Sequence, residues 1–234
     1  MAQQNWALMA GLALSLTLAM SRAHSAPVPV TFTELTGVTG GAPPTTGVFR
    51  ADLSGLRLGQ IASVTITDNS NGLGGASGQY SGFDLDAIVL SRVLITDAVQ
   101  VSGLTRAGRF DFGTSKLIPG SQRPPPDAAL FGTSGGRVDD AIATLDAFDA
   151  NPAIPGAFGF VSLGDGGVLA VNLLSPVPTG GPLYLYIGER GKNGEVAASG
   201  ITVSDRPIPA PEPGTLALLG TGLFGFGVMR RKRP

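Results

Sequence analysis

The clearest chemical motif in the chain is a pair of carboxylates, Asp84 and Asp86, separated by one residue in the segment 83–88. On a β-strand, alternate side chains share a face, so both carboxylates would lie opposite Phe83 and Leu85. Calcium suits such a pair because it binds about six to eight oxygens, and the glycine-rich loop just before it offers carbonyls. We therefore predict a structural calcium site. The alternatives are a solvated strand face, or carboxylates that cap loop amides.

Two tyrosines, Tyr184 and Tyr186, lie two residues apart in an apolar segment that has the pattern of a strand. They therefore share one face, where aromatic rings can stack on sugar rings. An aromatic pair at this spacing also packs against neighbouring strands. Ligand binding by this pair is one hypothesis, and packing is the alternative.

The residue types that the chain lacks limit its catalytic chemistry. It contains no cysteine, and its one histidine, His24, lies in an N-terminal segment that has the pattern of a leader. Zinc sites and catalysis by Ser-His-Asp or Cys-His groups need these residues. We therefore predict that the protein is not an enzyme. The alternative is a histidine-independent, glycan-active enzyme that uses paired acids. The acids grouped closely enough to suggest it are Asp139, Asp140, Asp146 and Asp149.

The charge balance argues against nucleic-acid binding. Acidic side chains outnumber basic ones between residues 26 and 210, and part of the basic charge lies at the two ends of the chain. Binding to nucleic acid depends on a basic surface. We therefore expect no nucleic-acid partner.

The body of the chain, residues 26–207, has the pattern of one all-β domain. Short segments in which apolar and polar residues nearly alternate are separated by glycine, asparagine, aspartate and proline. This pattern is typical of a β-sandwich or barrel. The predicted strands are 28–35, 47–53, 61–67, 86–93, 158–163, 167–174, 183–188 and 201–203.

Loops and turns complete the predicted body. Long loops rich in glycine or proline are expected at 68–82 and 119–136. The glycines at 164–167 favour a tight turn, so a β-hairpin is predicted over 160–169. One short helix is predicted within 138–147, where two aspartates near its start suit a helix N-terminus.

Three features follow one another at the end of the chain. Pro211, Glu212 and Pro213 come first, and an uncharged apolar segment follows up to Met229. As a helix this segment spans roughly 24 Å, which crosses a ~30 Å hydrocarbon core when the bilayer thins or flanking side chains snorkel. We predict a transmembrane helix with its basic end in the cytoplasm. The basic residues are Arg230, Arg231, Lys232 and Arg233.

Residues 1–25 have the pattern of a signal peptide, with an apolar run at 7–20 that we expect to be helical. Small residues at alternate positions suit cleavage by signal peptidase after Ala23 or Ser25. No lysine or arginine precedes the apolar run, which departs from the usual pattern. A retained membrane anchor is the alternative.

The C-terminal triplet, apolar segment and basic end together resemble the PEP-CTERM sorting signal of Gram-negative bacteria, with residues 208–234 as the sorting segment. The resemblance implies that an exosortase, an integral-membrane cysteine protease, recognises the tail and cuts near 211–213. Contact with the membrane would then be transient. It also implies a host that makes exopolysaccharide, and a final position on the cell surface or in the extracellular matrix.

Three stretches of the body, 83–90, 160–177 and 181–203, are similar to discoidin-like jelly-roll domains of bacterial secreted proteins. They contain a Gly-Phe-Asp-Leu-Asp-Ala-Ile strand, a Val-Ser-Leu-Gly-Asp-Gly-Gly turn and a Leu-Tyr-Ile-Gly-Glu strand. The resemblance implies a jelly-roll-like β-sandwich. Such folds often bind carbohydrate through their loops, sometimes with structural calcium, but a shared fold carries function only by analogy.

We therefore expect an exported, non-enzymatic β-sandwich protein that associates with exopolysaccharide or biofilm. The alternative is a purely structural surface protein with no discrete ligand. For the predicted exopolysaccharide-associated protein, the expected partners are signal peptidase, exosortase, the membrane and extracellular polysaccharide. Calcium at Asp84 and Asp86 is the one cofactor predicted.

Overall fold

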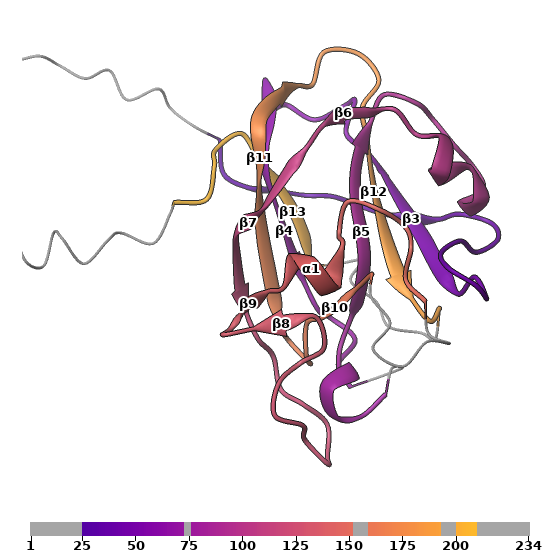
Figure 1. The fold of residues 1–234 in the computed structure, drawn as a ribbon. Coiled ribbons are helices and arrows are strands. Elements are labelled where there is room, and N and C mark those ends of the chain that lie inside the picture. Colours follow the sequence, from indigo (N-terminus) through magenta and orange to yellow (C-terminus); the bar gives the residue numbers. More distant parts are fainter. Residues whose placement is uncertain (1–24, 73–75, 152–158, 193–199, 210–234) are drawn as a thin grey trace, which may run out of the picture.

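The structure is a computed structural model that describes residues 25–72, 76–151, 159–192 and 200–209. Strands dominate these residues and form two antiparallel sheets with a shared apolar core between them (Figure 1). The predicted all-β sandwich is therefore confirmed. The finer prediction of a jelly-roll arrangement stays a prediction.

The first sheet has the strand order β1-β13-β4-β11-β7. Its strands are β1 (Val28–Pro29), β13 (Ile201–Ser204), β4 (Gln60–Thr67), β11 (Val168–Pro178) and β7 (Phe110–Ile118). Edge strand β1 pairs with β13, so that Val28 lies opposite Val203. Among the described residues, the first and the last strand are therefore neighbours.

The second sheet has the order β10-β5-β12-β3-β2, and β6 also pairs with β5. Its strands are β10 (Val161–Ser162), β5 (Asp84–Ser91), β12 (Tyr184–Arg190), β3 (Thr46–Asp52), β2 (Thr33–Glu34) and β6 (Arg106–Gly108). A separate small hairpin pairs β8 (Thr133–Ser134) with β9 (Arg137–Val138).

Apolar side chains are buried in two layers. The main core lies between the sheets, where Ile66 and Leu169 of the first sheet meet Leu85 and Leu185 of the second. Burying each such side chain contributes about 1.5–3 kcal/mol. A second cluster lies on the opposite face of the second sheet, which the 3-10 helix η2 (Ala98–Gly103) helps to cover. Both faces of β5 and β12 are therefore buried.

The predicted strands are found near β3, β4, β5, β11, β12 and β13, where the apolar alternation is strong. The segment 28–35 is divided, because β1 joins the first sheet and β2 joins the second. β7 was not predicted. It is an edge strand in which only Phe110 and Leu117 are buried, so its apolar pattern is weak.

The β-hairpin predicted over 160–169 is wrong. β10 pairs with β5 in the second sheet, while β11 pairs with β4 in the first, so this turn carries the chain between sheets. The tight turn itself is confirmed. Gly164 and Gly166 have φ angles of 77° and 75°, and the Gly167 N–H donates to the Gly164 carbonyl at 2.9 Å.

Three backbone segments meet at this turn with no room for side chains. A Cβ on Gly82 would lie 2.3 Å from the Gly164 carbonyl oxygen, and a Cβ on Gly164 would lie 2.7 Å from the carbonyl carbon of Gly120. Hydrogen bonds join the same segments: Gly164 donates to the Ser81 carbonyl at 2.8 Å, and Gly120 donates to the Leu163 carbonyl at 2.9 Å. Glycine is required because any larger residue would separate these backbones.

The loop predicted at 68–82 is present and is organised by Asp68, whose side chain is buried. Oδ1 of Asp68 accepts hydrogen bonds from the Ser70 hydroxyl at 2.6 Å and from the Phe83 amide at 2.9 Å. Oδ2 accepts from the Gly166 amide at 2.8 Å. One carboxylate thus connects the start of the loop, the start of β5 and the turn between the sheets.

The loop predicted at 119–136 is fastened to the body at several points. Arg123 makes a bidentate pair with Asp165, with Nη2 to Oδ1 at 2.6 Å and Nε to Oδ2 at 2.9 Å. This geometry is among the stronger forms of ion pair. The Gly78 amide also donates to the Arg123 carbonyl at 2.9 Å, which joins the loop to the 3-10 helix η1 (Gly78–Tyr80). The loop is longer than usual, but these contacts hold it against the body.

The short helix predicted within 138–147 is confirmed as α1 (Asp140–Ala143). Asp139 caps it, since its Oδ1 accepts from the Ala141 amide at 3.1 Å. The helix ends after one turn because Thr144 has a φ of 40°. Ala143 and Leu145 attach it to the main core.

The two terminal predictions lie almost wholly outside the described residues. The signal peptide contributes Ser25 alone, and the sorting segment contributes residues 208 and 209. No helix among the described residues is long and apolar enough to cross a membrane. The predicted transmembrane helix at the C-terminus is not tested by this structure.

We expect Gly167→Ala to lower the free energy of unfolding by about 3 kcal/mol. The added Cβ would lie 1.9 Å from the Leu163 carbonyl oxygen, a backbone atom that cannot rotate away. Gly180→Ala is the matched control, because nothing lies within 4 Å of its added Cβ. Urea unfolding of both variants measures the difference, and equal midpoints would contradict the role given to the turn.

Candidate functional site

Asp84 and Asp86 lie on β5, which is a central strand with both faces covered, and both side chains are buried. Phe83 and Leu85 point into the main core, so the predicted division of faces holds at the start of the strand. A shift in the pairing with β12 then brings Ile88 into the core as well, as a β-bulge does. The pair is therefore not on a solvated face.

Donors of the protein surround the Asp84 carboxylate. The Ser162 hydroxyl donates to Oδ1, and Nη1 of Arg190 lies 3.8 Å from Oδ2. The guanidinium of Arg190 also lies 5.0 Å from the ring centroid of Phe160, which stacks on Phe131 at 4.3 Å. Asp84 thus helps to place a cation on an aromatic stack.

Asp86 holds the segment that follows α1 against the second sheet. Oδ2 accepts a hydrogen bond from the Thr46 hydroxyl at 2.5 Å, and Oδ1 accepts from the amides of Asp149 and Ala150 at 3.1 and 3.2 Å. Burial raises the pKa of Asp86 to about 7, although these hydrogen bonds act in the opposite direction. Of the two alternatives to calcium, the capping of loop amides is what Asp86 does.

Across the described ranges, no group of three or more histidine, cysteine or acidic side chains is placed to hold a metal ion. The carboxylates of Asp84 and Asp86 accept hydrogen bonds from the protein instead. Calcium binding by the pair stays a prediction. The contacts in hand give both residues a structural role.

The Tyr184–Tyr186 hypothesis is corrected for one of its two residues. Tyr186 is fully buried, and its hydroxyl donates to the Val93 carbonyl at 2.8 Å and accepts from the Ile95 amide at 3.1 Å. It cannot stack on a sugar, because the chain that leads into η2 covers this face of the sheet. Tyr184 is half-buried, with its ring centroid 6.4 Å from that of Tyr186, and ligand binding by Tyr184 stays a prediction.

The four acids considered for catalysis have separate surroundings. Asp139 caps α1, Asp146 lies 3.7 Å from Arg106, and Asp149 accepts from the Thr144 hydroxyl at 2.9 Å. Partial burial raises the pKa values of Asp140 and Asp149, and neighbouring carboxylates act in the same direction. No pocket described here brings these acids together as a pair facing one cavity.

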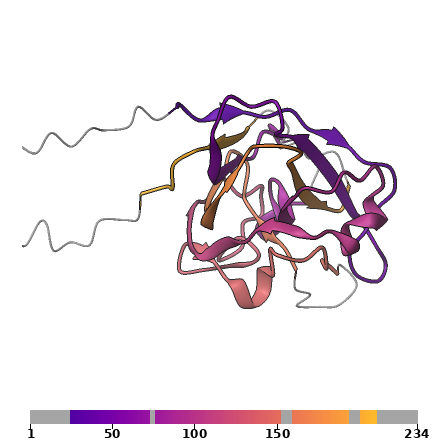
Figure 2. The same ribbon diagram turned by 90° about the horizontal axis from the view of Figure 1, so that it is seen from above.

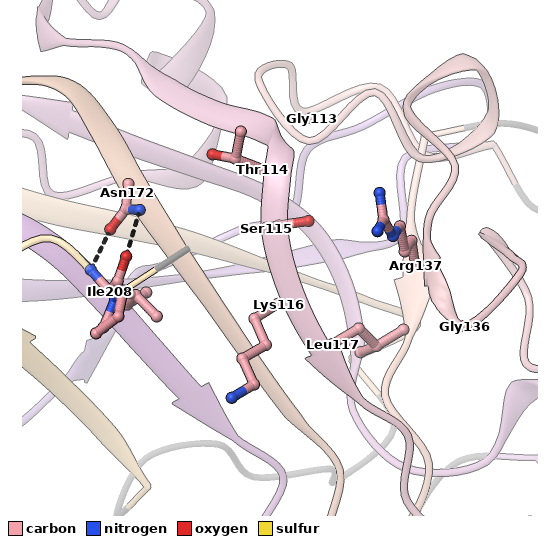
Figure 3. Close-up of a pocket in the computed structure, with 10 residues that line it drawn as sticks. Gly113, Thr114, Ser115, Lys116, Leu117, Gly136, Arg137, Asn172 and Ile208 are labelled. Carbon is pink, nitrogen blue, oxygen red and sulfur yellow. Dashed lines mark hydrogen bonds between the residues drawn. The ribbon is translucent and has the colours of Figure 1, made fainter. Parts of the chain in front are cut away.

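The chain that leads to the sorting segment is attached to the outer face of the first sheet. After β13 it crosses β4, where the Ser63 hydroxyl donates to the Arg206 carbonyl at 2.6 Å. It then crosses β11, where Asn172 makes two hydrogen bonds with Ile208 (Figure 3). Asn172 Nδ2 donates to the Ile208 carbonyl at 3.2 Å, and the Ile208 amide donates to Oδ1 at 2.6 Å. The side-chain amide thus acts as a strand partner.

A cavity of about 340 Å³ lies between this attached segment and β7. Lys116 and Thr114 extend from one side of β7, toward Asn172 and Ile208, while Arg137 lies on the other side (Figure 3). Both cations are exposed, and neither has an ion-pair partner in the part of the chain that the structure describes. Hydroxyls and cations of this kind bind sugar hydroxyl and carboxylate groups.

The two ends of the described body leave from the same side, as Figures 1 and 2 show. The cause is the pairing of β1 with β13, which the Ser25 amide extends by donating to Oδ2 of Asp205 at 3.3 Å. The end of the leader and the start of the sorting segment are therefore close in space.

A family comparison accounts for this end of the chain. Residues 209–233 match the model of the PEP-CTERM protein-sorting motif. The chain carries a PEP-CTERM sorting signal. The match includes Pro211, Glu212 and Pro213 and the basic residues at 230–233, and it begins directly after the contact between Asn172 and Ile208.

The PEP-CTERM signal indicates that the protein is processed by an exosortase and sorted to the surface or the extracellular space. Searches of curated proteins and of solved structures found no match. The resemblance of the body to discoidin-like domains is therefore not confirmed.

Sequence reasoning missed Asn172, Lys116, Arg137 and Asp205 in this region. Asn172 left a signal, since it is a lone amide in the apolar run of β11 and a polar residue there needs a partner. Lys116 lies on the strand that was not predicted. Asp205 left no signal, because a polar residue is common directly after a strand.

We expect the stability of the protein to fall as pH rises from about 5 to 8. The folded pKa of Asp86, about 7, is above the usual value of 3.8, so the folded state binds this proton more tightly than the unfolded state. The stabilisation is complete below the unfolded pKa and is lost as pH rises through the folded pKa. Urea unfolding across this range measures the trend.

Asp86→Asn should flatten this pH dependence, because the side-chain amide does not titrate. Its oxygen can still accept hydrogen bonds from the Asp149 and Ala150 amides. Asp52→Asn is the control, since hydrogen bonds from Ser54 lower the pKa of Asp52 and place its titration below this range. An unchanged pH dependence in Asp86→Asn would show that another group is responsible.

Proposed function

We propose that this protein is a non-enzymatic component of the extracellular matrix of a Gram-negative bacterium, sorted by exosortase and associated with exopolysaccharide. The observation that carries the proposal is the sorting motif at 209–233, which follows directly after the attachment of Ile208 to the first sheet. A body attached up to Ile208 would remain intact when the tail is cut near 211–213. Processing would then release a folded domain.

The residue types of the body support a binding role over a catalytic one. The chain has no cysteine, and its one histidine, His24, precedes the expected start of the mature protein. The buried acids Asp68, Asp84 and Asp86 are engaged with the protein itself. The buried acids therefore stabilise the fold, which favours a binding domain over an enzyme.

The cavity beside the sorting segment is the proposed contact with polysaccharide. Lys116 and Arg137 would pair with the carboxylates of an acidic glycan, and Thr114 would bond to its hydroxyls. β7 runs between the two cations, so a polymer lying across this edge strand would reach both (Figure 3). A single sugar on one side of the strand would reach only one of them.

Removing both cations tests the proposed contact. We expect Lys116→Ala/Arg137→Ala to lose retention on immobilised alginate, with affinity about tenfold lower, while dextran retains neither protein. Arg57→Ala/Arg109→Ala removes equal charge outside this cavity and should keep retention. Equal retention by the two double variants would reject the site. No retention of the parent protein on either polymer would favour a purely structural surface protein.

Processing is tested by intact mass of the protein from the culture medium and membrane fractions of a host with an exosortase. We expect the released form to lack residues beyond the Pro-Glu-Pro triplet. Changing Pro211, Glu212 and Pro213 together to alanine should leave the full tail in the membrane fraction. Pro207→Ala, just before the motif, is the control and should be released normally. Release of the triple variant would contradict exosortase processing at this motif.

A further inference from the structure

Asp205 has an unusual position and an incomplete set of partners. It directly follows β13, between the folded body and the sorting segment. Oδ2 accepts from the Ser25 amide at 3.3 Å, but Oδ1 is buried without a hydrogen-bond partner among the described residues. A buried acceptor without a donor is destabilising, so this oxygen indicates a missing partner.

Ser25 lies at the expected boundary of the leader. Cleavage after Ala23 or after Ser25 would make His24 or Ala26 the first residue of the mature protein. Either new amino terminus would lie one residue from the Ser25 nitrogen, within about 4 Å along the chain. An α-ammonium group brings a positive charge and three donors, whereas the amide in the uncut chain brings one.

We propose that Asp205 is the binding site for the amino terminus that leader removal creates. The ammonium group bonds to both carboxylate oxygens, which supplies the donor that Oδ1 lacks. In the described part of the chain, Asp205 has no competing ion pair with lysine or arginine. The proposal rests on the proposed function only for the removal of the leader.

This contact would strengthen a weak edge of the first sheet. β1 is two residues long, and its pairing with β13 through Val28 and Pro29 is continued by one hydrogen bond, from the Val30 amide to the Ile201 carbonyl at 3.0 Å. Asp205 also begins the segment that Ser63 and Asn172 attach to the sheet, and its carbonyl accepts from Gln60 Nε2 at 3.3 Å. The mature amino terminus therefore completes the attachment of the chain that leads into the sorting signal. The uncut precursor lacks the ammonium group.

A thermodynamic cycle tests the proposal on leader-free chains that begin at His24 or Ala26 and retain the sorting segment, in detergent. Each is prepared with a free or an acetylated α-amine, and with Asp205 or Asp205→Asn. We expect acetylation to lower Tm by roughly 2–4 °C with Asp205 and to have little effect in Asp205→Asn. The effect should shrink in high salt. Asp52→Asn is the control and should keep the full effect of acetylation.

Equal acetylation effects in the parent chain and in Asp205→Asn, for both starting residues, would overturn the proposal. If Asp205→Asn does not fold, reactivity of the α-amine with an acylating reagent decides the matter in the parent chain. We expect slower reaction than in a free peptide that begins at the same residue as the chain and ends at residue 33, and an equal rate would overturn the proposal. These measurements need neither exosortase nor glycan, so their failure is distinct from failure of the proposed function.

Discussion

The architecture depends on a point where backbones approach without side chains. Gly82, Gly120 and Gly164 allow three segments to contact one another, and the chain passes there from β10 in one sheet to β11 in the other. Asp68 stabilises this junction by accepting hydrogen bonds from the Phe83 and Gly166 amides. Because the contact is made of main-chain atoms, it holds the strands of one sheet at a defined position relative to the strands of the other. The loop at 68–82 ends beside this junction and the loop at 119–136 begins beside it, so the junction holds one end of each loop in place.

Buried carboxylates connect the loops to the sheets throughout this protein. Asp68, Asp84 and Asp86 each lose solvation on folding, and each recovers part of that cost through hydrogen bonds or an ion pair. At Asp86, burial outweighs three hydrogen-bond donors and raises the pKa of the carboxyl group to about 7. A domain without cysteine has no disulfides to fasten its loops. Buried acids perform that task here.

The sequence predicted the elements whose signals are local. Alternating apolar residues located β4 and β12, the aspartates before α1 located its start, and the glycines of 164–167 located a turn. Pairing between strands is not local, so the same turn was assigned to a hairpin although its strands belong to different sheets. The acids of β5 were predicted to bind calcium, and Tyr186 was considered for ligand binding. Nothing in a single strand shows that η2 and the segment after α1 cover this face of the sheet. The sorting motif was predictable because its composition is itself the signal.

The pairing of β1 with β13 has a consequence for the order of events in export. A protein that passes through the membrane from its amino terminus completes β13 only after most of the body has crossed, and β1 can find its partner only then. The first sheet is therefore closed by the last strand before the sorting segment. β13 ends only a few residues before the Pro-Glu-Pro triplet, so the first sheet can close only shortly before the triplet reaches the membrane. The contacts of Asn172 with Ile208 attach the chain to the first sheet three residues before Pro211, so closure of the sheet also fixes the position of Ile208.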